Sequence, residues 1–402
     1  MLKGPLLLLV KISNESNNEG EYIEMLSEQE NELLTQVGPG TQCGDMLRRY
    51  WWPVQFAENI TAKPVKVRLL GEDFVVYRGE NGKLAMLDLL CTHRLTSLEY
   101  GRVEGNAIRC PYHAWLFDAD GKCLAQPAER PTSTYKDKVR QGAYDVDEIG
   151  GLVFAYIGPK PAPAKPNYDI LYRADGLRTV GCDEDFCNWL QKAENGADLP
   201  HLPFLHADVF PDMAFKTPEG YEYEQRDYGF KGVLLIEGLR PRVVHYVMPS
   251  HSRFSTTPPK GMPPTHDMRF RVPVDDTLTH SYWVRLQPRE DGEFKMVTQG
   301  YANKQIGVYP KREDGYWNIP FSDQDRMAQE SQGFIADRTK EHLAESDRGI
   351  IMLRGMFKDA IKEVAEGRDP MGVIRGPQPE PIEFEATMSE KEYIDPASIA
   401  AE

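Results

Sequence analysis

From Trp52 to Gly158, apolar residues recur in short and partly alternating runs, a pattern that is typical of strands. The runs include VKVRLL, DFVVYRG and LAMLDLL, and turn-forming stretches such as GED and ENGK separate them. The stretch LFDADGKC predicts a hairpin with Asp120 and Gly121 at its turn, and GGLVFAYIG predicts another buried strand. We therefore predict a small all-β domain in this half of the chain.

The second half has a different pattern, which begins after the proline-rich connector PKPAPAKP at Pro159–Pro166. The stretch DEDFCNWLQKAENGADL has helical periodicity, and strand-like runs return between about 220 and 299. From Ser322 to about Ala365 the pattern is helical again, with charged residues on one face and apolar residues on the other. These elements predict an α+β fold, in which an antiparallel sheet packs against helices.

The N-terminal segment predicts one further helix. The apolar run at Pro5–Val10 is only six residues long and no small-residue cleavage site follows it, so we do not expect a signal peptide. The polar stretch NESNNEGEY is expected to be disordered, and the fold is expected to begin near Met25. There Ser27 and Glu30 fit a capping box, and Gly38-Pro39-Gly40 is expected to end the helix.

Composition and charge narrow the function. The chain has 402 residues, 41% of them hydrophobic, and a formal charge of −15. That charge argues against nucleic acid as a partner, because phosphate binding needs a basic surface. No stretch of 18 apolar residues predicts a membrane span. Six cysteines do not form a disulfide framework, and four are expected to be reduced thiols, which indicates a cytoplasmic protein: Cys43, Cys123, Cys182 and Cys187.

The other two cysteines belong to a metal-binding motif. In the stretch CTHRLTSLEYGRVEGNAIRCPYHAW, each of two loops supplies one cysteine and one histidine: Cys91 with His93, and Cys110 with His113. Structural zinc is the simplest interpretation, but common zinc patterns pair cysteine with cysteine and histidine with histidine along the chain. The mixed loops favour a two-iron cluster in which two cysteines hold one iron and two histidines the other. Such a cluster has a raised potential and carries single electrons.

A second motif, ENGADLPHLPFLHADVF, contains Asp198, His201 and His206. Two imidazoles and a carboxylate form the facial triad of non-haem iron oxygenases, which leaves one side of the metal open. Residues five apart on a regular helix differ in direction by roughly 140°, so both histidines could not face one metal from such a helix. Pro200 and Pro203 provide a break, and we predict a distorted helix around 199–204.

The third ligand is expected to be a carboxylate distant in sequence. Asp325 is favoured because it is expected to begin a helix, which would fix its orientation. Asp323, Asp337 and Asp347 are rivals, and any of them could be a solvated acidic residue instead.

With both motifs present, the chain resembles the oxygenase component of a Rieske non-haem iron oxygenase, and is most similar to the group of phthalate dioxygenase and related aromatic O-demethylases. The resemblance extends from Met25 to about Arg375 and includes RRYWWPV, FDADGKC and QDRMAQESQG. It implies an all-β Rieske [2Fe-2S] domain and a catalytic domain with an antiparallel sheet flanked by helices. The implied units are a disordered extension at 1–24, an N-terminal helix of the catalytic part at 25–50, the Rieske domain at 51–160, the catalytic domain at 167–376 and a tail at 377–402.

The resemblance also implies roles for the motif residues. Cys91, His93, Cys110 and His113 would hold the cluster, and His201, His206 and Asp325 would hold a mononuclear Fe(II). Asp198 would not be a ligand but would hydrogen-bond both an iron ligand and the second cluster histidine of a neighbouring subunit, which implies a homotrimer or a multiple of it. Where most relatives have glycine after the His-Arg of the first loop, this chain has Leu95, which is expected to alter the loop.

The resemblance further implies that electrons from NADH reach the cluster through a separate flavin and iron–sulfur reductase, since no G-x-G-x-x-G follows a strand in this chain. O₂ and a small aromatic substrate would then react by ring hydroxylation or O-demethylation. Arg240, Arg242 and Arg269 are candidates to pair with a substrate carboxylate, although each could be a surface residue. Two alternatives remain: an electron-transfer protein without oxygenase activity, and a zinc-stabilised binding module.

Overall fold

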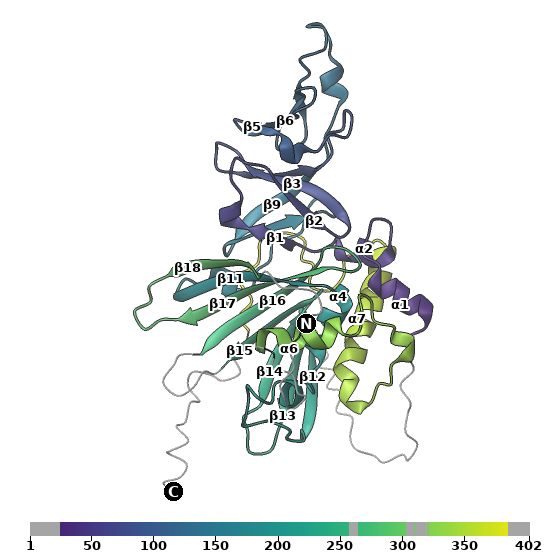
Figure 1. Ribbon diagram of the computed structural model, residues 1–402, viewed down its shortest axis with the longest axis vertical. Helices are drawn as coiled ribbons and strands as arrows, with labels where there is room; N and C mark the ends of the chain where they lie inside the picture. Colours follow the sequence, from purple (N-terminus) through teal and green to yellow (C-terminus); the bar gives the residue numbers. More distant parts are fainter. Residues whose placement is uncertain (1–24, 257–263, 303–308, 310–318, 320, 385–402) are drawn as a thin grey trace, which may run out of the picture.

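The protein is described by a computed structural model that covers residues 25–256, 264–302, 309, 319 and 321–384 (Figure 1). Three sheets follow one another along the long axis of the molecule: a small four-stranded sheet at the tip, a six-stranded sheet below it and an eight-stranded sheet below that. The expected disordered extension at 1–24 lies outside the described residues, as do residues 385–402 of the expected tail.

The strands between residues 52 and 156 form the predicted all-β region. The six-stranded sheet has the order β1-β10-β9-β4-β3-β2, with β1 Trp52–Phe56, β10 Leu152–Tyr156, β9 Ala143–Ile149, β4 Leu84–Asp88, β3 Glu72–Arg78 and β2 Val65–Leu69. The four-stranded sheet has the order β5-β6-β7-β8, with β5 Arg102–Glu104, β6 Ala107–Arg109, β7 Leu116–Phe117 and β8 Cys123–Ala125. The hairpin predicted at Asp120-Gly121 is confirmed between β7 and β8, where Gly121 has a φ of 78°.

The eight-stranded sheet has the order β12-β13-β14-β15-β16-β17-β11-β18. Its strands are β12 Gly220–Arg226, β13 Gly229–Leu235, β14 Arg242–Val247, β15 His251–Thr256, β16 Thr265–Pro273, β17 Thr279–Pro288, β11 Gly176–Asp185 and β18 Lys295–Ala302. Neighbouring strands are antiparallel, as predicted, except that β11 and β18 are parallel. The strand β18 does not pair with β17, which precedes it in sequence, but with the other edge of β11. The hydrophobic pattern of the sequence does not predict this pairing.

The alternation of side chains along β16 gives this sheet two different faces. Met268, Phe270 and Val272 belong to a core that includes residues of β1 and β10, and the rings of Phe270 and Phe154 meet edge to face with centroids 5.6 Å apart. Arg269 and the other odd-numbered residues of β16 therefore point to the opposite face. The six-stranded and eight-stranded sheets thus share one core, and the polar face is left for the helices.

The helix α1 Glu28–Thr35 confirms the predicted N-terminal helix, which ends before Gly38. A second short helix, α2 Gln42–Leu47, follows and was not predicted. The Ser27–Glu30 capping box is present. The helix α4 Trp189–Ala197 starts later than the pattern predicts, because β11 extends to Asp185 and Asn188 caps the helix by accepting from Leu190 N. The single helix predicted at 322–365 is wrong. It is divided into α6 Phe321–Glu330 and α7 Arg348–Ala365, with Gly333 at a φ of 94° between them.

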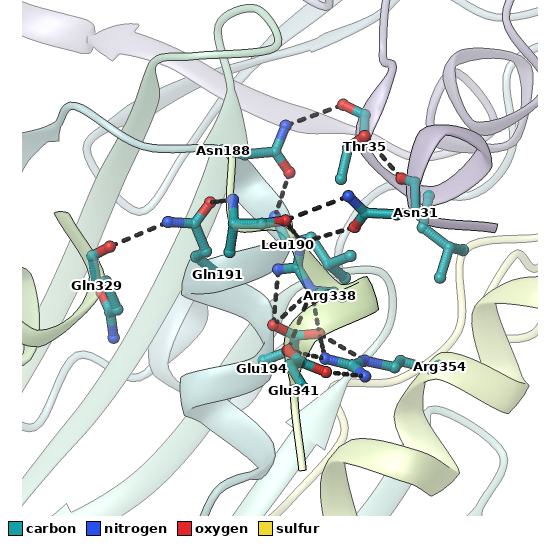
Figure 2. A network of polar contacts seen from close by, with 12 residues as sticks. Asn31, Thr35, Asn188, Leu190, Gln191, Glu194, Gln329, Arg338, Glu341 and Arg354 are labelled. Carbon is teal, nitrogen blue, oxygen red and sulfur yellow. Dashed lines mark hydrogen bonds and ion pairs between the residues drawn. The ribbon is translucent and has the colours of Figure 1, made fainter. Parts of the chain in front are cut away.

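A buried network of ion pairs joins α4 to the segments before and within α7 (Figure 2). Glu194 of α4 accepts from Arg338 at 2.7 Å and from Arg354 at 2.6 Å. Glu341 is the second partner of Arg354, at 2.8 Å. Arg338 is fully buried, and Asn31 of α1 accepts a further bond from it at 3.2 Å. These contacts fix the position of α4, which carries part of the site described below.

Residues 377–384, assigned above to a tail, pack against the folded chain. Ile382 pairs with Tyr168 in a parallel bridge, and Phe384 is buried. All six cysteines are free and buried. Within the described residues, no helix is both long and apolar enough to cross a membrane.

Candidate functional site

The two loops that carry Cys91 with His93 and Cys110 with His113 have the same backbone conformation. In the first loop, Cys91 N donates to Thr96 O at 2.9 Å and Leu95 N donates to Cys91 O at 2.8 Å. In the second, Cys110 N donates to Trp115 O at 2.8 Å and Ala114 N donates to Cys110 O at 3.1 Å. The fourth residue after each cysteine has a positive φ, 61° at Leu95 and 57° at Ala114. The loops are therefore a matched pair that emerges from β4 and from β6.

The two imidazoles of these loops lie close together, and the two thiols are close enough to interact with each other. Both thiols are almost fully buried, while both imidazoles are partly exposed, and the two imidazole centroids lie 4.6 Å apart. The indole of Trp115 stacks on His93 with centroids 4.1 Å apart and planes 6° apart. Leu95 is 68% exposed beside them, so its side chain projects from the loop into solvent.

The pKa shifts of the cysteine and histidine side chains in these loops are consistent with binding of a metal cation. Burial raises the pKa of Cys91 to about 12, although the backbone N–H groups of His93 and Arg94 act in the opposite direction. A thiolate there needs a positive charge beside it, which a metal supplies. Partial burial, together with His93 and Arg94, lowers the pKa of His113 and favours the neutral imidazole that binds metals.

A second cluster lies on the polar face of the eight-stranded sheet. The helix α4 ends at Ala197, Asp198 is extended, and the short helix α5 Leu202–Leu205 follows, which confirms the predicted break around 199–204. His201 and His206 flank α5, and Asp325 comes from the second turn of α6 rather than from its start. One ligand atom from each of these three residues lies within 4.8 Å of the others. The carboxylate Oδ1 of Asp325 is 3.5 Å from His201 Nε2 and 3.2 Å from His206 Nε2.

Neighbouring groups orient these three side chains. Asp198 O contacts His201 Nδ1, and Gln324 Oε1 lies 2.7 Å from His206 Nδ1. With both Nδ1 atoms engaged, both Nε2 atoms remain directed at Asp325. Asn195 Nδ2 donates to Asp325 Oδ1 at 3.2 Å. Neither Asn195 nor Gln324 belongs to a motif that would identify it from the sequence. Their positions are the only signal: Gln324 directly precedes Asp325, and Asn195 lies about one helical turn before Asp198.

The charges of this cluster favour a cation at its centre. Burial alone would raise the pKa of Asp325, but His206 and His201 outweigh burial and lower it. Burial alone would lower the pKa of His206, but Asp325 outweighs burial and raises it. A buried anion between two imidazole nitrogens therefore attracts positive charge, as a proton or as a metal ion.

Asp198 lies beside this cluster and not within it. Its carboxylate Oδ2 is 3.8 Å from His201 Nδ1, and burial raises its pKa. With His201, Asn195 and Gln329, it lines a cavity of about 470 Å³ that opens at the surface. Both side-chain polar atoms of Gln329 are buried and have no partner among the described residues.

The rival carboxylates do not join the cluster. Asp337 caps the short helix at Arg338–Lys340, and Asp323 and Asp347 are not among its ligand atoms within the described residues. Of the candidate arginines, Arg242 lies over the ring of Phe210, whose centroid is 6.2 Å from that of His206. Arg269 lies over the indole of Trp283 on the polar face of the sheet.

The chain is similar to known proteins over most of its length. A family model described as the Rieske [2Fe-2S] domain matches residues 50–136. The chain is 35% identical, over 88% of its length and 84% of the relative's, to the 5,5'-dehydrodivanillate O-demethylase oxygenase subunit of a Sphingobium species. It is 32% identical to the phenoxybenzoate dioxygenase subunit alpha of Ectopseudomonas oleovorans, over 85% of this chain and 87% of that one. The structure of NdmA from Pseudomonas putida CBB5 shares the fold at 20% identity, with a TM-score of 0.65 over 84% of this chain and 99% of that one.

Proposed function

Because the chain belongs to the Rieske non-haem iron oxygenases as an oxygenase component, we propose that it uses O₂ to oxidise a small aromatic carboxylate. The reaction would be ring hydroxylation or O-demethylation, with electrons from NADH delivered by a separate flavin and iron–sulfur reductase. The observation that carries this proposal is the convergence of His201, His206 and Asp325 in a chain that also presents a Rieske domain. The names of the two relatives support the substrate class, since both refer to carboxylated aromatic compounds.

The residues present fit both metal groups. Cys91, Cys110, His93 and His113 would hold the [2Fe-2S] cluster, and two imidazoles with one carboxylate would hold a mononuclear Fe(II). When bound, the cluster supplies single-electron transfer and the ferrous ion supplies O₂ activation. The chain contributes orientation: Gln324 and the Asp198 carbonyl hold the two imidazoles, and Asn195 holds the Asp325 carboxylate.

Electron transfer between subunits is part of this proposal. Within one chain, the cluster loops lie at the four-stranded tip, and the six-stranded sheet stands between them and α6 (Figure 1). A homotrimer would instead bring a neighbouring tip to the cavity lined by Asp198 and His201. There the Asp198 carboxylate would bridge an iron ligand and the second cluster histidine of that neighbour, and would orient both rings.

Metal analysis and one variant test the proposal against its alternatives. We expect purified protein to be red-brown, to contain three irons per chain and to form product only with O₂, a reductase and NADH. His201→Ala should keep the colour and lose the product, while the control Arg289→Gln, a change at a partly exposed side chain, should keep both. Full activity of His201→Ala would refute the ligand assignment.

The same measurements separate the alternatives. Two irons per chain, without product, would indicate an electron-transfer protein. A colourless protein rich in zinc would indicate a zinc-stabilised module. A formaldehyde assay with methoxylated aromatic acids would distinguish O-demethylation from ring hydroxylation.

A further inference from the structure

The buried arginines of this protein differ in how their charges are balanced. Four of them pair with a carboxylate at 2.9 Å or less: Arg253, Arg326, Arg338 and Arg354. A fifth, Arg178, donates to two backbone carbonyls. Arg271 is 93% buried, but among the described residues its guanidinium donates only to the hydroxyl of Ser252, at 2.9 Å. A guanidinium has several N–H donors in one plane, so most of its hydrogen-bonding capacity is unused.

Arg271 lies on the same face of the sheet as the three converging residues. On β16 it alternates with Phe270 and Val272, which face the core shared with the six-stranded sheet. A methyl group on Gly196 of α4 would lie 3.7 Å from Arg271 Nη1, so the guanidinium is next to this helix. The preceding residue, Asn195, donates to Asp325. The guanidinium therefore lies against the same helix that holds Asp325, and Asp325 is near enough to raise the pKa of Arg271.

A second cation strengthens this local excess of positive charge. Arg269 is two residues from Arg271 on the same strand and face, and it lies over the indole of Trp283 at 5.7 Å. Its nearest carboxylate, Asp267, is 3.9 Å away and already accepts from Arg285 at 2.8 Å. Of the other carboxylates facing Arg271, Asp185 pairs with Lys192 at 3.1 Å, and Asp325 is a candidate iron ligand. Among the residues that the structure describes, these two neighbouring guanidinium groups thus have little opposing charge.

An anion that entered this region would complete the charge balance. A carboxylate matches the planar fork of a guanidinium and can accept two parallel hydrogen bonds from it. Burial of Arg271 without a partner carboxylate is otherwise unfavourable, as burial lowers its pKa and the nearby Arg269 acts in the same direction. The indole of Trp283 offers an apolar surface beside the cations, on which an aromatic ring can stack.

We propose that Arg271, positioned by Ser252 and assisted by Arg269, binds the carboxylate of the substrate and sets the distance between the reacting carbon and the iron. The inference rests on the proposed function, and it names the residues that give this site its specificity for acids. Arg271 was not among the arginines that the sequence singles out. Its strand neighbour Arg269 was.

Binding measurements without turnover test this inference. The probes are benzoate, phthalate, 3-methoxybenzoate and 4-hydroxy-3-methoxybenzoate, each compared with its neutral carboxamide by calorimetric titration into the full iron-loaded protein. We expect at least one acid to bind the wild-type protein about tenfold or more tightly than its carboxamide, since a charge-assisted pair with a buried guanidinium is lost in the amide. Equal binding of every acid and its carboxamide by the wild-type protein would overturn the proposal.

Variants assign the effect to residues. Arg271→Gln should weaken binding of the acid by roughly 10- to 100-fold and leave the carboxamide unchanged, and Arg271→Lys should fall between the two. Arg269→Gln, a change at a partly exposed side chain, should reduce the preference for the acid several-fold even if Arg271→Gln does not fold. The control Arg289→Gln, at another partly exposed side chain, should have no effect. Retention of the full acid preference in Arg269→Gln and in any folded Arg271 variant would overturn the proposal.

Turnover separates this proposal from the function on which it rests. With an acid that binds, Arg271→Gln should raise KM far more than it lowers kcat. Absence of any O₂-dependent product from the wild-type protein would refute the oxygenase function but leave the acid preference standing. Oxidation of neutral aromatic compounds with no preference for acids would refute the role of Arg271 but leave the oxygenase function standing.

Discussion

Replacing Glu194 with glutamine tests how the site is supported. The change keeps the size of the side chain but removes the charge that Arg338 and Arg354 share in Figure 2. These two arginines are 0% and 4% exposed, so the variant leaves two buried guanidinium groups with Glu341 as their remaining carboxylate. Breaking a buried ion pair by removing one partner costs about 3 to 5 kcal/mol.

The matched control is Glu345→Gln. Its pair with Arg348 joins side chains that are 82% and 52% exposed, and removing such a pair costs about 0 to 1 kcal/mol. An unfolding entropy of about 2.1 cal/mol/K per residue means that 1 kcal/mol shifts the melting temperature of a chain of this length by roughly 1 °C. The Glu194 variant should therefore melt about 4 to 6 °C below the wild-type protein in calorimetry, and the control should melt within about 1 °C of it.

The pH dependence of this difference can be derived from the pKa of Glu194. Burial alone would raise that pKa, but Arg338 and Arg354 outweigh burial and lower it below the ordinary value of 4.5. A lowered folded-state pKa means that the stabilisation is fully present above about pH 4.5 and is lost as the pH falls through the folded-state value. The difference in melting temperature between wild type and Glu194→Gln should therefore be full at pH 7 and shrink below pH 4.5. A Glu194 variant as stable at pH 7 as the Glu345 control would refute this reasoning.

Three further variants test single features of the sites. Asp198→Asn should keep both metals but nearly abolish product formation, because the proposed bridge between subunits is lost; normal turnover would reject that role. Gln324→Leu should weaken iron binding about 10- to 100-fold in a chelator titration, because the His206 ring loses the acceptor that orients it. Cluster absorbance is the control, and unchanged iron affinity would contradict the assignment. Leu95→Gly should stabilise the loop by about 1 kcal/mol, because the φ of 61° at this position is unfavourable for leucine and not for glycine. The temperature at which the cluster is lost on heating should therefore rise. A lower temperature would show that the leucine side chain stabilises the loop.

The ligand types and the turn signals in the sequence predicted that His201 and His206 meet a carboxylate that is distant in sequence. Pro200 and Pro203 indicated a broken helix between His201 and His206, since proline has a local steric effect that needs no tertiary context. The capping box at Ser27 and Glu30 is local in the same sense.

Features that depend on distant partners could not be predicted. The parallel pairing of β18 with β11 and the packing of residues 377–384 depend on segments far away in sequence. The roles of Asn195 and Gln324 exist only because α4 and α6 lie side by side. The apolar periodicity continues through Gly333, so it predicted one helix where the structure has α6 and α7. Periodicity does not reveal that a single glycine between them has a positive φ.

The position of the six-stranded sheet has a consequence for what counts as one working unit. That sheet keeps the tip loops away from α6 of the same chain. In a lone protomer, a cluster in the tip loops would therefore have no iron site close enough to receive its electrons, and the iron site would have no nearby electron donor. If neighbours exchange electrons as proposed, every complete active unit is made from two chains, and each chain serves two such units. The homotrimer, and not the single chain, would then be the smallest assembly that can catalyse the reaction.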